Sequence, residues 1–371
     1  MTTSKKIVVV GMSGGVDSSV SALLLKQQGY EVIGMFMKNW EEADAQGVCN
    51  ASKEYADVVA VCEQIGMRCY SVNFVKEYRE HVFTHFLEEY RQGYTPNPDI
   101  LCNREIKFKA MYEKALELGA DYLATGHYCQ TDGVHLLKGR DPGKDQSYFL
   151  YTLKSDILSK ILFPVGHLLK SEVRDLARQH GLATSEKKDS TGICFIGERN
   201  FKQFLGQYLE ASPGNFENLD GKVVGNHEGA AYYTMGQRRG MGIGGAGEAW
   251  FVVGKDISRN VVYVDQGTRH PALYCDELEA SEISWVDGEP VAYPFSCRSK
   301  VRYRQPDQEC QIVSVKEGKA SVQFRIPQRV VTPRQSIVFY ADDICLGGAV
   351  IDRAGTSYHA RGISLPAQVS L

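Results

Sequence analysis

The stretch Gly11-Met12-Ser13-Gly14-Gly15-Val16-Asp17-Ser18-Ser19 stands between an apolar run and a helical pattern. The run before it, Ile7-Val8-Val9-Val10, has four β-branched residues without polar alternation, which is typical of a buried parallel strand. After it, Val20, Leu23 and Leu24 recur at helical spacing. A glycine-rich turn between a strand and a helix directs backbone N–H groups and the positive helix end towards one point. This arrangement predicts an anion site, most simply for phosphate.

The loop lacks the lysine of the common ATPase loop, which ends in Gly-Lys-Ser/Thr and brings its lysine to the terminal phosphates. The corresponding place holds Asp17-Ser18-Ser19, so transfer of the γ-phosphoryl group is not expected. The pattern Ser-Gly-Gly-x-Asp-Ser-Ser resembles the pyrophosphatase (PP) loop of enzymes that split ATP between its α and β phosphates and activate a substrate oxygen as an adenylate. The alternative is an ordinary serine-rich helix cap, which explains neither the two glycines nor the buried strand.

The chain has 371 residues, of which 43% are hydrophobic and 23% are charged, and its formal net charge is -3. This composition indicates a globular protein. The length predicts about two or three domains. The charge argues against a generally basic binder of DNA or RNA, although a local basic face is allowed. The ten cysteines show no Cys-x-x-Cys spacing, and no apolar run is long enough for a signal peptide or a membrane span. We therefore expect a cytoplasmic enzyme with no resident metal, no DNA partner and no membrane contact, whose cysteines act as thiols.

Strand and helix patterns alternate through the first half of the chain. Strands are expected at 31–37, 69–74 and 120–124, and helices at 52–65, 78–90, 103–118 and 170–180. This alternation predicts an α/β doubly wound parallel sheet, whose ligands bind beyond the carboxyl ends of the strands. Met37, Gly126 and the opening loop all lie at such ends, so three segments can converge on one nucleotide.

Cys102 follows a stiff segment, Tyr94 to Leu101, whose two prolines are expected to exclude regular structure until a helix begins at Asn103. A thiol at a helix N-terminus gains thiolate character from the helix dipole, which makes it nucleophilic. Asp99, one turn earlier, is placed to exchange a proton with a substrate. Taken alone, Cys102 fits a small buried hydrophobic residue better, and Asp99 fits a helix cap.

A second cysteine, Cys194, stands in the cationic, hydroxyl-rich stretch Lys187-Lys188-Asp189-Ser190-Thr191-Gly192-Ile193-Cys194-Phe195-Ile196-Gly197. Lys187 and Lys188 favour a thiolate, whereas an inert cysteine usually lies in an apolar run. The competing interpretation is that residues 193–196 form one short buried strand. For Cys194 by itself, the two interpretations are equally open.

The second half of the chain has short apolar runs and glycine turns between about residues 221 and 267. The run Gly242-Ile243-Gly244-Gly245-Ala246-Gly247 satisfies Gly-x-Gly-x-x-Gly, but a strand rather than a helix follows at Trp250–Val253, so it is not a dinucleotide site. The nearby Gly236-Gln237-Arg238-Arg239 is either a turn that faces RNA or a solvated charged turn.

From residue 278 to 352 the pattern is all β, and five strands at 297–303, 311–315, 320–324, 336–340 and 347–351 predict a small barrel. Between Arg298 and Arg334 there are nine Lys or Arg against three acids, a local balance of 9 − 3 = +6. Such a face would neutralise phosphates of a folded RNA, although alternation alone can also produce a solvated face. The tail after Arg353 is rich in Gly, Ser and Pro and is expected to be a loose end.

Motifs along almost the whole chain resemble one family in the right order. Beside the PP-loop, they are Met37-Lys38-Asn39-Trp40, Asn97-Pro98-Asp99 with Cys102, Ala124-Thr125-Gly126-His127-Tyr128, Asp145-Gln146-Ser147-Tyr148-Phe149-Leu150 and Ser190-Thr191-Gly192-Ile193-Cys194. Together they are similar to the tRNA-specific 2-thiouridylases, bacterial enzymes that place sulfur on the wobble uridine of tRNA.

The resemblance implies a role for each matching position. ATP would be bound by Gly11, Met12, Ser13, Gly14, Gly15, Val16, Asp17, Ser18, Met37 and Gly126. The target base would be held by Asn97, Pro98 and Asp99. Cys102 would be the nucleophile and Cys194 the carrier of a persulfide. Further tRNA contacts would come from His127, Lys144, Asp145, Gln146, Arg302, Tyr303 and Gln335.

We expect the 2-carbonyl oxygen of uracil to attack the α phosphate of ATP, with pyrophosphate leaving and Mg2+ shielding the charge. A persulfide on Cys194, loaded by a sulfur-relay protein, then delivers sulfur, while Cys102 attacks the persulfide or the intermediate and Asp99 moves the proton. The two thiols would end as a disulfide that cellular reductants reopen.

The expected domains are a PP-loop catalytic domain at 1–199, a central β-rich domain at 200–275 and a tRNA-binding barrel at 276–371. Two other classes of protein remain. A PP-loop amidating synthetase shares the loop but needs an ammonia source, and the chain has no glutaminase-like segment. An RNA-binding protein that uses ATP only structurally explains the basic barrel but not the two cysteines.

Overall fold

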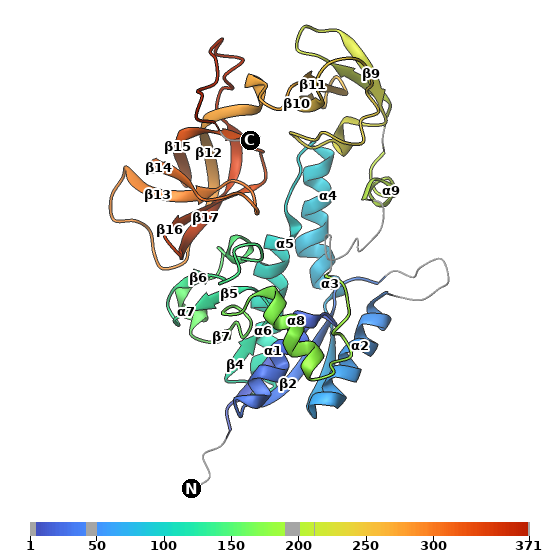
Figure 1. Cartoon of the computed structure of the whole chain (residues 1–371), viewed down its shortest axis with the longest axis vertical. Helices are drawn as coiled ribbons and strands as arrows, with labels where there is room; N and C mark the ends of the chain where they lie inside the picture. The colour runs from blue at the N-terminus through green and yellow to red at the C-terminus, as the bar shows by residue number, and fades with distance from the viewer. Residues whose placement is uncertain (1–4, 42–49, 190–200, 211, 370–371) are drawn as a thin grey trace.

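The computed structural model describes residues 5–41, 50–189, 201–210 and 212–369, which form three sheets. Figure 1 shows an α/β domain that holds the N-terminal half, a central body around β9 to β11, and a barrel around β12 to β17. The central body and the barrel lie side by side at one end of the α/β domain. Helix α4 (Thr84–Arg91) rises from the α/β domain and contacts η4 (Ala230–Tyr232) of the central body.

Parallel strands in the order β3-β2-β1-β4-β7 form the sheet of the α/β domain. Their bounds are β1 Ile7–Met12, β2 Glu31–Lys38, β3 Arg68–Asn73, β4 Tyr122–Ala124 and β7 Ile161–Leu162. The doubly wound sheet and four of its strands are confirmed, and β7 is an edge strand that the sequence pattern did not predict. Because β2 and β4 flank β1 on opposite sides, the loop after β1 lies where the strand order reverses, which is where such sheets bind ligands.

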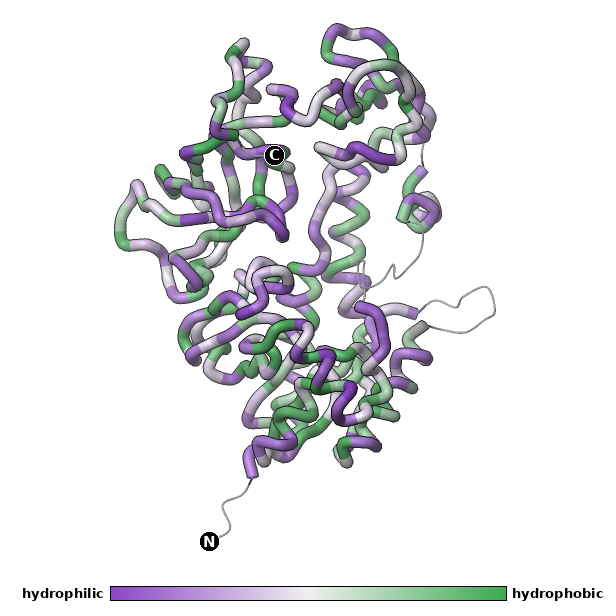
Figure 2. Tube along the Cα trace, viewed as in Figure 1, coloured by the Kyte–Doolittle hydropathy of each residue, from purple (hydrophilic) through white to green (hydrophobic). Residues whose placement is uncertain are grey.

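The side chains of β1 are buried on both faces of the sheet. Val8 and Val10 pack with residues of helices α1 (Val16–Gln27) and α2 (Asn50–Ile65), whereas Val9 packs on the opposite side with Met111. This two-sided burial explains why the strand lacks polar alternation. In Figure 2 the hydrophobic segments of the α/β domain gather where its sheet and helices meet.

Two long helices each contain a π-helical section. The first consists of α3 Val75–Tyr78, η1 Arg79–Phe83 and α4, and the second of α5 Pro98–Leu101, η2 Cys102–Ala110 and α6 Met111–Glu117. The other helical segments are η3 Ser147–Phe149, α7 Ser155–Leu158, α8 Lys170–Gln179, α9 Phe201–Leu205 and η5 Pro271–Leu273.

The prediction that the second helix begins at Asn103 is wrong, because the helix begins at Pro98. Asn97 caps it, with its Oδ1 accepting the N–H of Asp99 at 3.2 Å. Proline is well suited to the first helical position, where its missing N–H would have no partner within the helix. Cys102 therefore lies one turn inside the helix.

The central body is a sheet in the order β10-β11-β8-β9. Its strands are β8 Gly214–Glu217, β9 Val223–His227, β10 Trp250–Asp256 and β11 Val261–Gln266. β10 begins at Trp250, which confirms that a strand and not a helix follows the glycine run at 242–247. Phe216, Val252 and Val262 form the centre of its small core.

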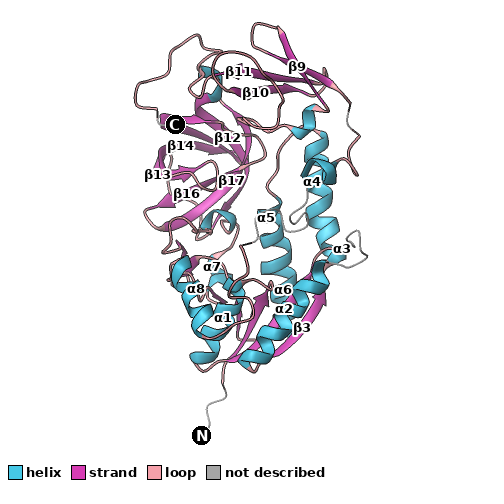
Figure 3. Cartoon of the chain, turned by 45° about the vertical axis from the view of Figure 1, so that its right-hand side comes forward, coloured by secondary structure: helices cyan, strands magenta, loops and turns pink. Residues whose placement is uncertain are grey.

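A closed barrel forms the C-terminal body, seen from another side in Figure 3. Its strands are β12 Tyr274–Trp285, β13 Phe295–Lys300, β14 Gln308–Lys316, β15 Lys319–Arg329, β16 Ser336–Ala341 and β17 Ile344–Ala354. The five-strand prediction missed β12, which closes the barrel by pairing with both β15 and β17. Register shifts interrupt the inward–outward alternation of β12, and this explains why its pattern was not recognised. The first predicted strand also ends at Lys300 and not at Tyr303.

A hairpin of the α/β domain extends the barrel sheet. It consists of β5 Cys129–Thr131 and β6 Leu136–Lys138, and β6 pairs with β17 through Leu136 opposite Cys345 and Leu137 opposite Ile344. The hairpin follows β4 after only four residues, Thr125 to Tyr128. The barrel is thus joined to the segment that carries Gly126.

The tail is not a loose end. Tyr358 and Val369 are buried in a cluster with Phe251 of β10 and Tyr274 of β12. The Tyr358 hydroxyl donates to Asp276 at 2.9 Å. The tail therefore joins the central body to the barrel, a role that its polar composition did not reveal.

Replacing Tyr358 with alanine should detach the tail and lower the free energy of unfolding by about 3 kcal/mol, because a packed ring and a hydrogen bond are lost together. Thermal unfolding and the rate of trypsin cleavage at Arg361 measure the change. Ile363→Ala is the matched control, since Ile363 lies on the same tail but is 46% exposed. Equal effects of the two substitutions would show that the buried ring does not anchor the tail.

Candidate nucleotide and sulfur-transfer site

The loop after β1 is closed by its own hydroxyl groups. Ser18 Oγ accepts the N–H of Ser13 at 3.2 Å and donates to the Gly15 carbonyl at 3.1 Å, and Ser19 Oγ donates to the same carbonyl at 2.9 Å. Gly14 has a φ of +72°, and a Cβ there would lie 2.8 Å from the Glu54 carbonyl oxygen. Only glycine fits this turn, which supports the phosphate-loop prediction for residues 11–18.

Asp17 stands in the first turn of α1 and has three hydrogen bonds from two side chains. Lys170 Nζ contacts its two carboxylate oxygens at 2.6 and 2.9 Å, and the Tyr128 hydroxyl donates to Oδ1 at 2.7 Å. Burial, followed by the charge of Asp17, raises the pKa of Tyr128, so this hydroxyl keeps its proton and remains a donor. The carboxylate at the loop is therefore fixed in one orientation.

Three strand ends converge at this loop, as predicted. Met12 of β1 pairs with Phe36, the neighbour of Met37, and Val10 pairs with Ala124, two residues before Gly126. A Cβ on Gly126 would lie 2.8 Å from the Ser18 nitrogen, so this position also needs glycine. The predicted nucleotide residues of the loop, of β2 and of the segment after β4 are brought together.

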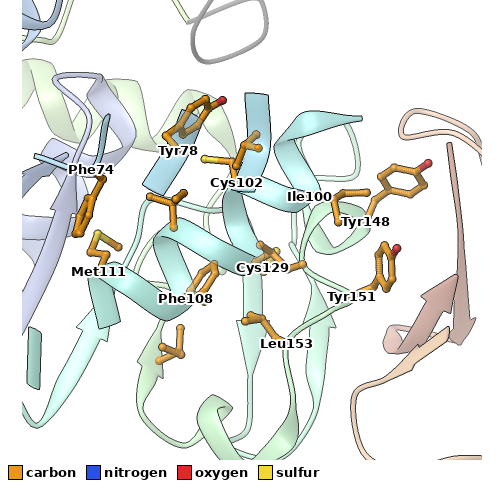
Figure 4. Close-up of a cluster of buried hydrophobic side chains, with 14 of the residues drawn as sticks. Phe74, Tyr78, Ile100, Cys102, Phe108, Met111, Cys129, Tyr148, Tyr151 and Leu153 are labelled. Atoms are coloured by element: carbon orange, nitrogen blue, oxygen red, sulfur yellow. The ribbon is translucent and has the colours of Figure 1, made fainter. Parts of the chain in front are cut away.

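Cys102 is buried with 1% of its surface exposed, in an apolar cluster that contains Tyr78, Ile100 and Phe108. Figure 4 shows its sulfur beside Tyr78 at the top of this cluster. Because Cys102 lies inside the helix, the first-turn dipole that the sequence interpretation invoked is not what surrounds its thiol. Asn97 caps the helix and Pro98 opens it, so the predicted base-binding segment lies directly before Cys102.

Cys194 lies outside the described residues, so its predicted pairing with Cys102 stays a prediction. The residues that lead to it are described as far as Asp189. Lys187 Nζ forms an ion pair with Asp57 of α2 at 2.6 Å. The charge of Lys187 is therefore largely compensated, and the argument that it favours a thiolate at Cys194 is weakened.

His127 was expected to lie against tRNA, but its ring is in the interior, next to Phe108 and Phe163. Lys107 Nζ lies 3.4 Å from Nε2 and Thr125 Oγ1 lies 2.8 Å from Nδ1. Since an ammonium group only donates, Nε2 accepts and Nδ1 carries the proton. Burial and then the charge of Lys107 lower the pKa of His127, so the ring is neutral. The tRNA contact remains a prediction that this burial argues against.

The predicted tRNA segment Lys144-Asp145-Gln146 is largely used for internal contacts. Asp145 is buried, and its carboxylate accepts the N–H groups of Gly139 and Ser147 and contacts Lys300 of the barrel at 3.3 Å. Lys144 Nζ pairs with Asp189 at 2.6 Å. The side chain of Asp145 thus serves the junction with the barrel and is too buried to be presented to RNA.

The other residues predicted to contact tRNA lie on the barrel side of the same junction: Arg302, Tyr303 and Gln335. The ring of Tyr303 packs 4.4 Å from that of Phe149, and Gln335 Nε2 donates to the carbonyl of Thr95. Arg302 is exposed, and among the described residues no carboxylate oxygen lies within 4.0 Å of its guanidinium. Arg302 is therefore the member of this set that is available for a phosphate.

The basic stretch between Arg298 and Arg334 carries less net charge in the structure than in the sequence. Lys300, Arg325 and Arg334 pair with Asp145, Glu309 and Glu89, and Arg298 lies 3.9 Å from Asp342. Three of these four acids lie outside the stretch. The +6 balance is therefore partly neutralised by acids that lie outside the stretch.

Comparison with known proteins gives relatives along nearly the whole chain. A protein of Protochlamydia amoebophila (strain UWE25) named tRNA-specific 2-thiouridylase MnmA is 62% identical over 370 residues, which cover 98% of each chain. Proteins of the same name from Bacillus subtilis (strain 168) and Geobacillus thermodenitrificans (strain NG80-2) are 58% identical, over 93% of this chain and 94% of theirs. The chain belongs to the tRNA-specific 2-thiouridylase family.

Family models match each of the three bodies in turn. A tRNA methyl transferase HUP domain matches residues 6–198, a tRNA methyl transferase PRC-barrel domain 202–266 and an aminomethyltransferase beta-barrel domain 275–351. A solved 4-thiouridine synthetase in complex with RNA and bound ATP is 18% identical, with a TM-score of 0.33 over 54% of this chain and 50% of that one. An NMN synthetase from Francisella tularensis is 17% identical, with a TM-score of 0.31 over 49% and 66%. These two structural likenesses are too weak to support an argument about the site.

Lys170, Tyr128 and Asp189 contribute to the site, yet the sequence interpretation gave none of them a role. Lys170 is the first residue of α8 and is 153 positions from Asp17. Tyr128 stands directly after the predicted Gly126-His127 pair, and this adjacency was the only signal that could have singled it out.

Two negative observations apply to the part of the chain that the structure describes. No helix there is both long and apolar enough to cross a membrane. No group of three His, Cys, Asp or Glu side chains there is arranged to hold a metal ion.

Proposed function

We propose that this chain replaces the 2-oxygen of the wobble uridine of tRNA with sulfur and cleaves ATP to AMP and pyrophosphate in the process. The observation that carries this proposal is a phosphate loop that has Asp17 where the common ATPase loop has a lysine. The loop lies where three strand ends converge. The chain that contains it is 62% identical to a protein named tRNA-specific 2-thiouridylase MnmA. Residues 1–199 would carry out the chemistry, with residues 200–275 and 276–371 holding the tRNA.

In the first half-reaction, residues 11–18 would bind the phosphates of ATP, while Met37 and Gly126 would lie against the rest of the nucleotide. The uracil 2-oxygen forms a bond to the α phosphorus as the bond to pyrophosphate breaks. The N–H groups at the start of α1 and the hydroxyl of Ser13 supply the electrostatic stabilisation. Asn97, Pro98 and Asp99 would hold the base, which must leave its stack to reach the loop.

Mg2+ fits this site as a companion of ATP. The ion is commonly held by one or two carboxylates together with substrate phosphates, and it does not need a cage of protein ligands. Asp17 is the carboxylate of the loop and would hold it. When bound, Mg2+ shields the negative charge of the departing pyrophosphate.

In the second half-reaction, the terminal sulfur of a persulfide on Cys194 forms a bond to the uracil C2 carbon, and AMP departs with the former 2-oxygen. The Cys102 thiolate attacks Cys194 Sγ, so the persulfide S–S bond breaks and both electrons of that bond stay with the transferred sulfur. A Cys102–Cys194 disulfide remains, and two electrons from a cellular thiol reduce it. Asp99 would take up the proton that this sequence releases. A persulfide-donating relay protein would reload Cys194.

Mass analysis of tRNA after incubation with the protein, Mg-ATP and a persulfide donor tests this proposal. One 2-thiouridine should form for each AMP and each pyrophosphate released. Release of ADP and inorganic phosphate would contradict the loop assignment. Glutamine-dependent pyrophosphate release without tRNA would favour an amidating synthetase, and tRNA binding without ATP consumption would favour a purely RNA-binding protein.

Replacing Arg302 or Arg304 with glutamate should weaken tRNA binding about tenfold and reduce the slope of log affinity against log salt by about one, because a phosphate contact is lost. Arg304 is exposed and, like Arg302, lies near no carboxylate among the described residues. Arg353→Glu is the control, because Arg353 on the same barrel is already paired with Glu279 at 2.5 Å. An unchanged salt slope in both test variants would remove these arginines from the RNA footprint.

A further inference from the structure

Lys170 lies at the centre of a charge network that joins the nucleotide loop to the end of the described segment before Cys194. Its Nζ contacts both carboxylate oxygens of Asp17, at 2.6 and 2.9 Å, and Asp189 Oδ1 at 2.9 Å. The side chain of Lys170 is only 12% exposed. Its charge is therefore committed to two carboxylates and is little screened by solvent.

The second carboxylate of the network is itself held by three cations. Arg174 Nη2 lies 2.6 Å from Asp189 Oδ1, and Lys144 Nζ lies 2.6 Å from Oδ2. Burial alone would raise the pKa of Asp189, but the hydrogen bonds from Lys144 and Lys170 outweigh it and lower the pKa to about 2. Asp189 is thus a permanent anion that fixes the Lys170 ammonium beside the loop.

We propose that Lys170 is a positioning residue for the nucleotide loop and that it acts through Asp17. Its fork-like contact with both Asp17 oxygens, together with the hydrogen bond from Tyr128, leaves the carboxylate one orientation at the start of α1. Without the ammonium, the partly buried Asp17 carboxylate would keep only the hydrogen bond from Tyr128 and could rotate. A carboxylate free to rotate would no longer be set to hold the Mg2+ that accompanies ATP, and nucleotide binding would weaken.

The alternative role for Lys170 is direct contact with a phosphate, as the lysine of the common ATPase loop makes. The geometry favours the indirect role, because an ammonium group has three N–H donors and the three carboxylate oxygens within 2.9 Å can occupy all of them. A phosphate contact would require Lys170 to give up one of its partners.

The proposal rests on the proposed function only in taking ATP as the nucleotide. The test is the binding of the analogue α,β-methylene-ATP, measured by calorimetry in the presence of Mg2+. Lys170→Met should lower the affinity about tenfold. Lys170→Arg, which keeps the charge and can contact a carboxylate through two N–H groups, should restore it to within about threefold. Lys138→Met is the matched control, since Lys138 forms a similarly buried ion pair with Asp307 at 2.5 Å, away from the loop.

A double-mutant cycle separates the two roles of Lys170. In an Asp17→Asn background, Lys170→Met should change the affinity by less than about twofold, because its target has been removed. If the double variant loses as much affinity as the product of the losses in Lys170→Met and Asp17→Asn, Lys170 contacts the nucleotide independently and the positioning role is refuted. If Lys138→Met weakens nucleotide binding as much as Lys170→Met, the effect is a general loss of stability and the proposal also fails.

A steady-state assay adds a readout that a general structural defect would not give. Lys170→Met should raise the KM for ATP, with the KM for tRNA unchanged, and a parallel rise in both would refute the proposal. Should the wild-type protein bind the analogue but form no 2-thiouridine, the proposed function fails, while the cycle still decides the role of Lys170.

Discussion

Replacing Cys102 with serine is expected to lower the rate of 2-thiouridine formation by about a thousandfold or more, while adenylation of tRNA continues. The reason is electronic: transfer of a sulfane sulfur needs two electrons, which the Cys102 thiolate supplies when it attacks Cys194. A serine hydroxyl cannot form that bond. Cys194→Ser should likewise carry no persulfide and make no thiouridine.

Single-turnover reactions with α-labelled ATP, analysed without reductant, measure both steps. The wild type should contain a Cys102–Cys194 disulfide, which requires the two Cα atoms to come within about 7 Å of each other in a catalytic state. Cys194→Ser should accumulate the label on tRNA, whereas Cys102→Ser should release the label as AMP and keep the tRNA bound to Cys194 through the uncleaved persulfide S–S bond. Full thiolation by either variant would refute the two-thiol mechanism but leave the nucleotide site unaffected.

Cys129→Ser is the control for the loss of stability that follows when a hydroxyl group is placed in this buried cluster. Cys129 is also fully buried in the same group of side chains, as Figure 4 shows, and it has no role in the proposed chemistry. It should lose stability to a similar extent as Cys102→Ser and still thiolate tRNA. Loss of thiolation in this variant would mean that packing, and not sulfur chemistry, explains the Cys102 result.

Gly14→Ala is expected to lower the rate of pyrophosphate release by about a hundredfold or more, because displacement of a phosphate-binding loop by about 1 Å has effects of that size. The added Cβ would meet the Glu54 carbonyl oxygen at 2.8 Å, and the backbone of α2 cannot yield as a flexible side chain would. The positive φ of 72° adds strain. Affinity for tRNA, which is expected to depend mainly on the barrel, should change little.

The matched control is Gly29→Ala at the end of α1. Gly29 has a φ of +90°, so alanine is strained there as well, but its Cβ would meet no atom within 4 Å. This variant should be less stable and retain its ATP chemistry. If both alanines reduced pyrophosphate release equally, strain alone would account for the loss, and close packing of the loop against α2 would not matter.

The sequence was most informative where one short segment determines the outcome. The buried strand β1, the glycine loop and Gly126 each depend on local backbone and side-chain requirements, and the structure places all of them as predicted. The start of the second helix is the exception. There, Pro98 was interpreted as a helix breaker although it occupies the position that favours proline.

Features that depend on distant partners could not be predicted in the same way. The Lys170–Asp17 contact spans 153 positions, and the hydrogen bond from Tyr358 to Asp276 spans 82. The net positive charge of the stretch between Arg298 and Arg334 was overestimated because its ion-pair partners could not be seen in the sequence. Asp145, Glu89 and Asp342, which lie outside the stretch, neutralise part of its charge. β12 was missed because its register shifts break the period of two.

The short connection from β4 to the β5–β6 hairpin limits how this protein can be divided. An isolated barrel cut near residue 276 would lose β6 and would leave β17 with an open edge at Ile344 and Cys345, a site where a second chain could add and aggregate. A chimera that borrows the barrel must therefore also carry residues 129–138. Because that hairpin starts one residue after Tyr128, a partner of Asp17, the exchange of one body between relatives would also alter the backbone at the nucleotide loop.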